Sequence, residues 1–200
     1  MNNFTQNFSK ENYNTFAPAD NICEAIVNHW FDNLPNLWKL LFYTDRQPLY
    51  HDDLTPAQKS NMICKDPTID GATSSKNILF QKDIDDGISI AIPQIRIRTG
   101  DQVPINSYQG YIEIEIQIIV PNKLASIITD FSQVSDRAVQ INREITKSLN
   151  GKALSESGGN SPLFMNKSAP NGAGRNTGWF RIDNVSKNYS GFYGFFTMLV

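Results

Sequence analysis

A strict alternation of isoleucine with polar residues between positions 112 and 118 is the feature that most constrains the fold. Successive side chains of a strand point to opposite faces of a sheet, so this pattern favours a strand with one buried face. We expect it to span Tyr108 to Val120, within a mainly antiparallel sheet. The two sets of side chains are Ile112, Ile114, Ile116 and Ile118 on one face and Glu113, Glu115 and Gln117 on the other.

A helical apolar stripe follows this strand and predicts one long amphipathic helix from about 130 to 149. Charged and amide side chains, Arg137 among them, cover its opposite side, and Asn150-Gly151 is typical of a helix end. We expect the helix to pack on the sheet, which makes the fold class α+β. The crossover that it forms to the next strand suggests a split βαβ unit. The stripe consists of Val134, Ala138, Ile141, Ile145 and Leu149.

Short helices are expected before the sheet, between residues 19 and 65. Asp20 is a candidate N-cap of the first helix, and Leu37 to Phe42 form a second apolar segment. Thr55 followed by Pro56 predicts the start of a third helix, because proline suits the first helical position. The remaining strands are predicted at 77–81, 88–92, 95–97, 178–182 and 191–200, with a turn at 100–107.

The chain divides into an extended arm, residues 1–18, and a single α+β domain, residues 19–200. The domain comprises short helices at 19–65 and a sheet with its helix at 77–200, including a long loop at 151–177. The arm interleaves asparagines with aromatic side chains that would suit docking on a partner. These candidate docking residues are Phe4, Phe8, Tyr13 and Phe16.

The composition argues against a nucleic-acid binder. The chain has 18 Lys and Arg, a formal net charge of −2, and as many as 22 Ile and 21 Asn. Scattered basic residues give no general affinity for phosphate.

Cys23 and Cys64 are expected to be two buried thiols, with a single disulfide as the alternative. With no signal-like N-terminus and no long apolar run, we expect synthesis in the cytoplasm and no membrane contact.

Catalytic motifs are weak throughout, so we expect no enzymatic activity, no cofactor and no metal. His51-Asp52-Asp53 supplies too few ligands for a zinc site, and Asp83 to Gly87 lacks the later glutamate of a calcium loop. Glu113 and Glu115 lie on one strand face, whereas a glycosidase pair needs carboxylates on opposite sides of a cleft. We interpret Glu113, Glu115 and Gln117 as a candidate subunit-contact face.

Three groups of segments resemble the neck proteins of large tailed bacteriophages, which are rings of the tail-terminator or head–tail connector type. The resemblance implies a virion protein that forms a homo-oligomeric ring and binds portal, neck and tail neighbours. DNA would pass through the ring without specific binding. In such a ring, Glu113, Glu115 and Gln117 are a candidate face that lines the channel, as the alternative to a subunit contact. These segments are 36–43 with 53–63, 94–98 with 110–116, and 142–145 with 148–152 and 189–194.

Two other functions stay open on the sequence. The first is another phage tail or baseplate accessory component, which differs from a neck ring only in its place in the virion. The second is a small-molecule binding or enzymatic domain, which would need a deep polar pocket with perturbed acids.

Overall fold

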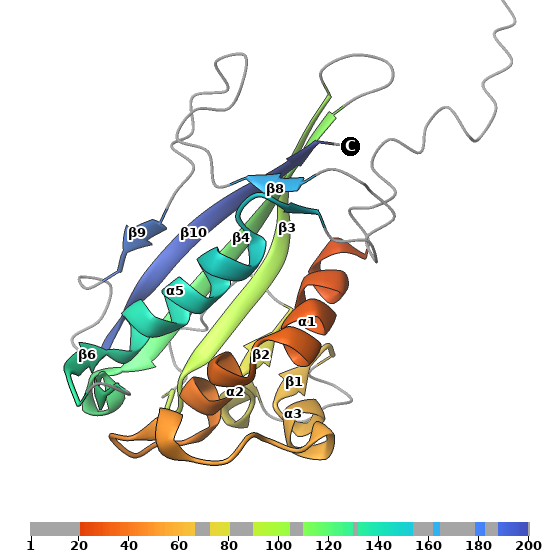
Figure 1. Ribbon diagram of the computed structural model, residues 1–200. Helices are drawn as coiled ribbons and strands as arrows, with labels where there is room; N and C mark the ends of the chain where they lie inside the picture. The colour runs from red at the N-terminus through yellow and green to blue at the C-terminus, as the bar shows by residue number, and fades with distance from the viewer. Residues whose placement is uncertain are drawn as a thin grey trace, which may run out of the picture.

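The computed structural model shows a twisted sheet with helices on one face, which agrees with the α+β class in its broad form (Figure 1). Three long strands form its centre, β3 (Gln94–Pro104), β4 (Gly110–Pro121) and β10 (Tyr189–Leu199). The residues that the structure describes are 21–66, 73–80, 90–104, 110–129, 132–153, 162–164, 179–182 and 188–199.

The sheet is mixed, and this corrects the expected mainly antiparallel sheet. β3 and β10 are both antiparallel to β4, but β2 (Ile78–Leu79) runs parallel to β3 and β1 (Ile63–Cys64) runs parallel to β2. The parallel pairs arise because a chain segment crosses over between each of these short strands and the next. The strand order is β1-β2-β3-β4-β10-β8-β7, and β9 also pairs with β10.

The expected long helix is also corrected. The helix α5 covers only Arg137–Leu149, 13 residues, and its predicted first turns are instead the strand β6 (Val134–Asp136). β6 pairs with β5 (Ser126–Ile128), and the Asp136 carboxylate caps α5 by accepting a hydrogen bond from the Ala138 amide at 2.8 Å. Val134, assigned to the helical stripe, is 70% exposed.

Three helices, not one, cover the isoleucine face of β4. α1 (Ile22–Asn33) and α2 (Pro35–Phe42) lie beside α5 in front of the sheet (Figure 1). Burying an isoleucine contributes about 1.5–3 kcal/mol, so this layer supplies much of the stability. The core that they enclose includes Ile26, Trp30, Leu37, Trp38, Ile95, Ile97, Ile112, Ile114, Ile116, Ile118, Ile141, Ile145 and Phe196.

The third predicted helix is confirmed as α3 (Pro56–Asn61). Thr55 is its N-cap and forms a capping box, in which its hydroxyl accepts from the Gln58 amide and the Gln58 side chain accepts from the Thr55 amide. Both cysteines are free and buried, as predicted. Burial raises the pKa of Cys23 to about 11, against a weaker effect of its contact with Thr99, so this thiol stays protonated.

The last strands attach α5 to the sheet. β10 is antiparallel to both β4 and β9 (Trp179–Arg181), so β4 and β9 run parallel, as a split βαβ unit requires. Trp179 donates a hydrogen bond from Nε1 to Thr146 on α5 at 2.8 Å and lies directly over Gly194. A Cβ at Gly194 would come within 2.3 Å of the indole, so only glycine permits this approach. The sheet is completed by β7 (Lys152–Ala153) and β8 (Pro162–Phe164).

The strands β3 and β4 continue beyond the helices as a long hairpin, where a turn had been predicted at 100–107 (Figure 1). A register shift between Thr99 and Gln102 absorbs one extra residue in β3 and lets the pairing resume as far as Pro104. Residues 101–104 are exposed. The predicted arm 1–18 and most of the loop 151–177 lie outside the described residues. The strand predicted at 88–92 is wrong where it is described, because residues 90–92 form no strand and the Ile90 amide donates to the Tyr189 hydroxyl at 2.8 Å.

Candidate functional site

The face of the sheet that turns away from the helices carries charged side chains along its central strands. Glu115 of β4 lies opposite Arg98 of β3, and Gln117 lies opposite both Arg96 of β3 and Tyr193 of β10. Directly opposed residues share one face of a sheet. We call this the polar face, and it consists of Arg96, Arg98, Glu113, Glu115, Gln117 and Tyr193.

Two of the three candidate contact residues are buried, which differs from the predicted strand with one buried face. Glu113 is 9% exposed and Glu115 is 5% exposed, while Gln117 is half-buried. Long side chains from the two neighbouring strands lie against Glu115 and take it out of solvent. The alternation in the sequence identified the face correctly but gave no information about what covers it.

Glu115 links three strands through its carboxylate. Arg98 forms an ion pair with Glu115 Oε2, and the Tyr193 hydroxyl donates a hydrogen bond to the same oxygen. Burial raises the pKa of Tyr193, and its hydrogen bond to Glu115 adds to the rise. Burial by itself would lower the pKa of Arg98, but its contacts with Tyr193 and Glu115 raise it overall. The carboxylate is therefore held between an arginine that stays charged and a phenol that stays protonated.

Gly100 permits the two glutamates to approach β3 closely. A Cβ at this position would come within 2.9 Å of Glu115 Oε1 and 3.0 Å of Glu113 Oε1. Both carboxylates thus lean over the glycine, beside the register shift at the start of the projecting hairpin. A side chain at position 100 would force at least one carboxylate to move.

This arrangement acts chemically as an ionic cross-link. Glu115 is committed to Arg98 and Tyr193, so its charge is balanced within the sheet. Within the part of the chain that the structure describes, no group of three or more His, Cys, Asp or Glu side chains could hold a metal ion. The cross-link fixes the direction of the hairpin relative to β10.

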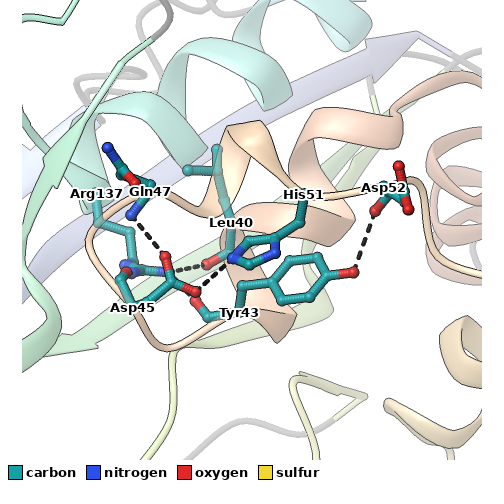
Figure 2. Close-up of polar contacts among 7 residues, drawn as sticks. All are labelled: Leu40, Tyr43, Asp45, Gln47, His51, Asp52 and Arg137. Carbon is teal, nitrogen blue, oxygen red and sulfur yellow. Dashed lines mark hydrogen bonds and ion pairs between the residues drawn. The ribbon is translucent and has the colours of Figure 1, made fainter.

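A second polar cluster lies on the connector between α2 and α3, residues 43–53, and Figure 2 shows its members. The His51 Nε2 donates to Asp45 Oδ2 at 2.6 Å, and the Tyr43 ring stacks on the imidazole with centroids 4.0 Å apart. The Tyr43 hydroxyl donates to the Asp52 carbonyl at 3.2 Å. The Asp45 carboxylate also accepts a hydrogen bond from the Gln47 amide at 2.6 Å.

Arg137, the first residue of α5, binds the connector through hydrogen bonds to its backbone. Its guanidinium donates to the backbone carbonyls of Leu40 at 2.7 Å, Tyr43 at 2.6 Å and Asp45 at 2.5 Å, and its Nε donates to Leu124 at 2.8 Å. The bonds to Leu40, Tyr43 and Asp45 satisfy carbonyls at and just after the end of α2, and the bond to Leu124 ties the same side chain to the turn that follows β4. Burial lowers the pKa of Arg137 to about 10, with Asp45 opposing the shift, so the side chain stays charged near neutral pH.

The partners in this cluster differ from those that the sequence suggests. His51 was considered with Asp52 and Asp53, whereas the structure pairs it with Asp45 and pairs Asp53 with Lys39 at 2.7 Å. Arg137 was assigned to the solvent side of its helix, yet it is fully buried. One feature of the sequence could have indicated that Arg137 is buried. It follows the N-cap Asp136 directly, and the first turn of a helix often packs against a neighbouring element.

The remaining predicted site residues cannot be placed. The docking residues of the arm, Phe4, Phe8, Tyr13 and Phe16, lie outside the described residues, as does the acidic segment 83–87. Among the helices that the structure describes, none is long and apolar enough to cross a membrane.

No family model matches the chain, and no curated protein or solved structure is detectably similar to it.

Proposed function

We propose that this chain is a structural subunit of a homo-oligomeric ring in the neck of a large tailed bacteriophage, of the tail-terminator or head–tail connector type. It would join the portal side to the tail, and it would act without catalysis or cofactor. The proposal begins from the segments that resemble neck proteins and from the nearly neutral charge of the chain. A channel that makes few Lys and Arg contacts to phosphate lets DNA slide.

The observation that carries the proposal is the projecting β3–β4 hairpin. Its outer part, residues 101–104, extends past α1 and α5 and is exposed (Figure 1). Val103 leaves 41% of its surface in solvent although it lies in a regular strand. Beyond the helices β4 stays paired with β10 as far as Tyr111, so the surface that a neighbouring copy can reach is the exposed end of β3. Head-to-tail contacts between such surfaces close into rings.

The cross-link at Glu115 supports the same function. It ties β3, β4 and β10 together where the hairpin leaves the helix layer. A rigid arm loses less conformational freedom on binding a neighbour than a flexible one. Because Arg98 balances the Glu115 charge, this face presents no strong field to DNA.

The test compares two exposed valines at opposite ends of the molecule. Val103→Asp alters the hairpin, and Val134→Asp alters the β5–β6 hairpin, where Val134 is 70% exposed. Both variants are expected to keep the melting temperature of the unchanged protein, since exposed substitutions usually change stability by less than about 0.5 kcal/mol. Negative-stain microscopy should show rings for the unchanged chain and for Val134→Asp, and dispersed subunits for Val103→Asp.

Rings that survive Val103→Asp would contradict the role of the hairpin. The place in the virion needs a separate test, which is the identity of the genes that flank this reading frame. Portal, neck or tail genes are expected on either side. A setting among metabolic genes would contradict the neck assignment even for a chain that forms rings.

A further inference from the structure

The connector brings together residues that are separated along the chain by a polar turn. His51 and Asp45 close the segment between them with one hydrogen bond of 2.6 Å, and the Tyr43 ring lies nearly parallel to the imidazole at 16° (Figure 2). The two partners keep 42% and 47% of their side-chain surfaces exposed. Protons in solution therefore reach this pair directly.

The pair is coupled to two other elements through the backbone. The Asp45 carbonyl accepts from Arg137 at the start of α5, and the Arg46 carbonyl accepts from the Ile128 amide of β5 at 2.6 Å. The Gln47 amide donates to the Asp45 carboxylate itself. A change in how His51 holds Asp45 thus alters how firmly the connector lies against α5 and β5.

We propose that His51 and Asp45 form a proton-controlled latch that fastens the connector, residues 43–53, to α5 and β5. Histidine is the side chain whose charge ordinarily changes between pH 5 and 8. When the imidazole is protonated and Asp45 is ionised, the contact is an ion pair and the latch is closed. The neutral imidazole still donates from Nε2, so loss of the proton weakens the contact and loosens the latch.

Other charged groups reach the surroundings of the pair from the neighbouring elements. Arg137 approaches from α5, and Lys39 of α2 is paired with Asp53 beyond the histidine. Arg46 reaches Ser126 of β5 at 3.3 Å. None of these arginine, lysine or carboxylate groups ordinarily changes protonation between pH 6 and 8. The imidazole is therefore the group that responds.

The sign of the effect follows from the two charges. Hydrogen bonds from the Gln47 amide and His51 outweigh the opposing effect of burial and lower the pKa of Asp45, so this carboxylate stays ionised at pH 6. Because protons favour the ion pair over the neutral contact, the latch is stronger at pH 6 than at pH 8. This inference does not depend on the proposed ring, because every contact lies within one subunit.

Hydrogen exchange of the full chain tests the latch. The reporting amides are Gln47, Tyr50 and Ile128, each of which donates a hydrogen bond in or to the connector. Protection factors, corrected for the intrinsic pH dependence of exchange, are measured at pH 6 and pH 8. We expect protection of these amides to fall about two- to fivefold at pH 8, as a half-exposed ion pair allows.

Two single variants separate the latch from general effects. His51→Gln keeps a donor but cannot be charged, so its connector amides should show equal protection at both pH values. The chain has two histidines, and His29→Gln is the matched control because His29 lies on α1, where its ring contacts Asn33. That control should keep the full difference. An unchanged protein without the difference, or a His51→Gln variant that keeps it, would overturn the proposal.

Discussion

The two polar clusters of this molecule use similar parts in different surroundings. Each pairs a carboxylate with a basic side chain and includes a tyrosine. In the sheet, Glu115 contacts both Arg98 and Tyr193. On the connector, Asp45 contacts His51, and Tyr43 stacks on the imidazole. The Glu115 side chain is 6% exposed, whereas that of Asp45 is 47% exposed. Burial is the main difference between them.

Burial decides what each cluster can do. Charges removed from water interact strongly and are costly to separate, so the sheet cluster holds three strands in one arrangement. Exposed charges are screened by water and salt, so the connector cluster contributes little stability and can respond to pH. One cluster acts as a fixed cross-link and the other as an adjustable contact.

Arg137→Met is expected to lower the free energy of unfolding most, because it removes the buried side chain that holds the backbone beside the His51–Asp45 pair. Four carbonyl groups lose their donor, and a buried polar group without a partner costs about 1–3 kcal/mol. We expect a loss of about 3–5 kcal/mol, measured by urea unfolding. Arg143→Met, on the exposed side of α5, is the control and should change stability by less than about 0.5 kcal/mol. Similar losses for both variants would show that the anchor is unimportant.

Glu115→Gln tests whether the sheet cluster is the strong one. Arg98 would keep its charge in a partly buried site without its carboxylate, and we expect a loss of about 1–3 kcal/mol. The comparison variant is Asp53→Asn on the connector, where the carboxylate is 64% exposed and pairs with the mostly buried Lys39, and it should cost less than about 1 kcal/mol. If Asp53→Asn proved the more costly variant, the contrast between the two regions would be wrong.

Gly100→Ala probes the close approach of the glutamates at the base of the hairpin. The added methyl group would collide with the Glu113 and Glu115 carboxylates, and we expect a loss of about 1–2 kcal/mol in thermal unfolding. In a Glu115→Ala background the same change should cost less, because the two substitutions share one space. Strictly additive losses would mean that the carboxylates do not crowd this position.

Asp45→Asn is expected to have the smallest effect, and it sharpens the account of the exposed cluster. The folded chain lowers the pKa of Asp45, mainly through hydrogen bonds from Gln47 and His51 that exceed the opposing effect of burial. Such a carboxyl stabilises the fold above its unfolded pKa of about 4 and loses that contribution as pH falls through the folded value. Asparagine should lower stability at pH 6 by a few tenths of a kcal/mol and change nothing at pH 2. An equal loss at both pH values would contradict the electrostatic explanation.

The sequence predicted the fold where the hydrophobic pattern determines it. The isoleucines of β4, the apolar residues of α1 and α2, and the proline after Thr55 all indicated their elements correctly. The predictions were wrong where pairing with distant residues decides the structure. Val134 fits a helical stripe, but pairing with Ile128 across a short turn places it in a strand.

The polar clusters were harder to predict because they depend on contacts between distant segments. Arg98 and Tyr193 both contact Glu115 across strand pairs, and no spacing in the sequence encodes that meeting. Arg137 binds carbonyls from residues more than ninety positions earlier. Backbone carbonyls carry no sequence signal at all, so such an anchor is visible only in three dimensions.

The mass of the purified full chain in native mass spectrometry tests the central claim most directly. A ring subunit should give a closed assembly whose mass is a single multiple of 22.5 kDa, at concentrations where strand-mediated contacts form. A chain that stays at 22.5 kDa over the whole accessible concentration range would contradict the proposed ring.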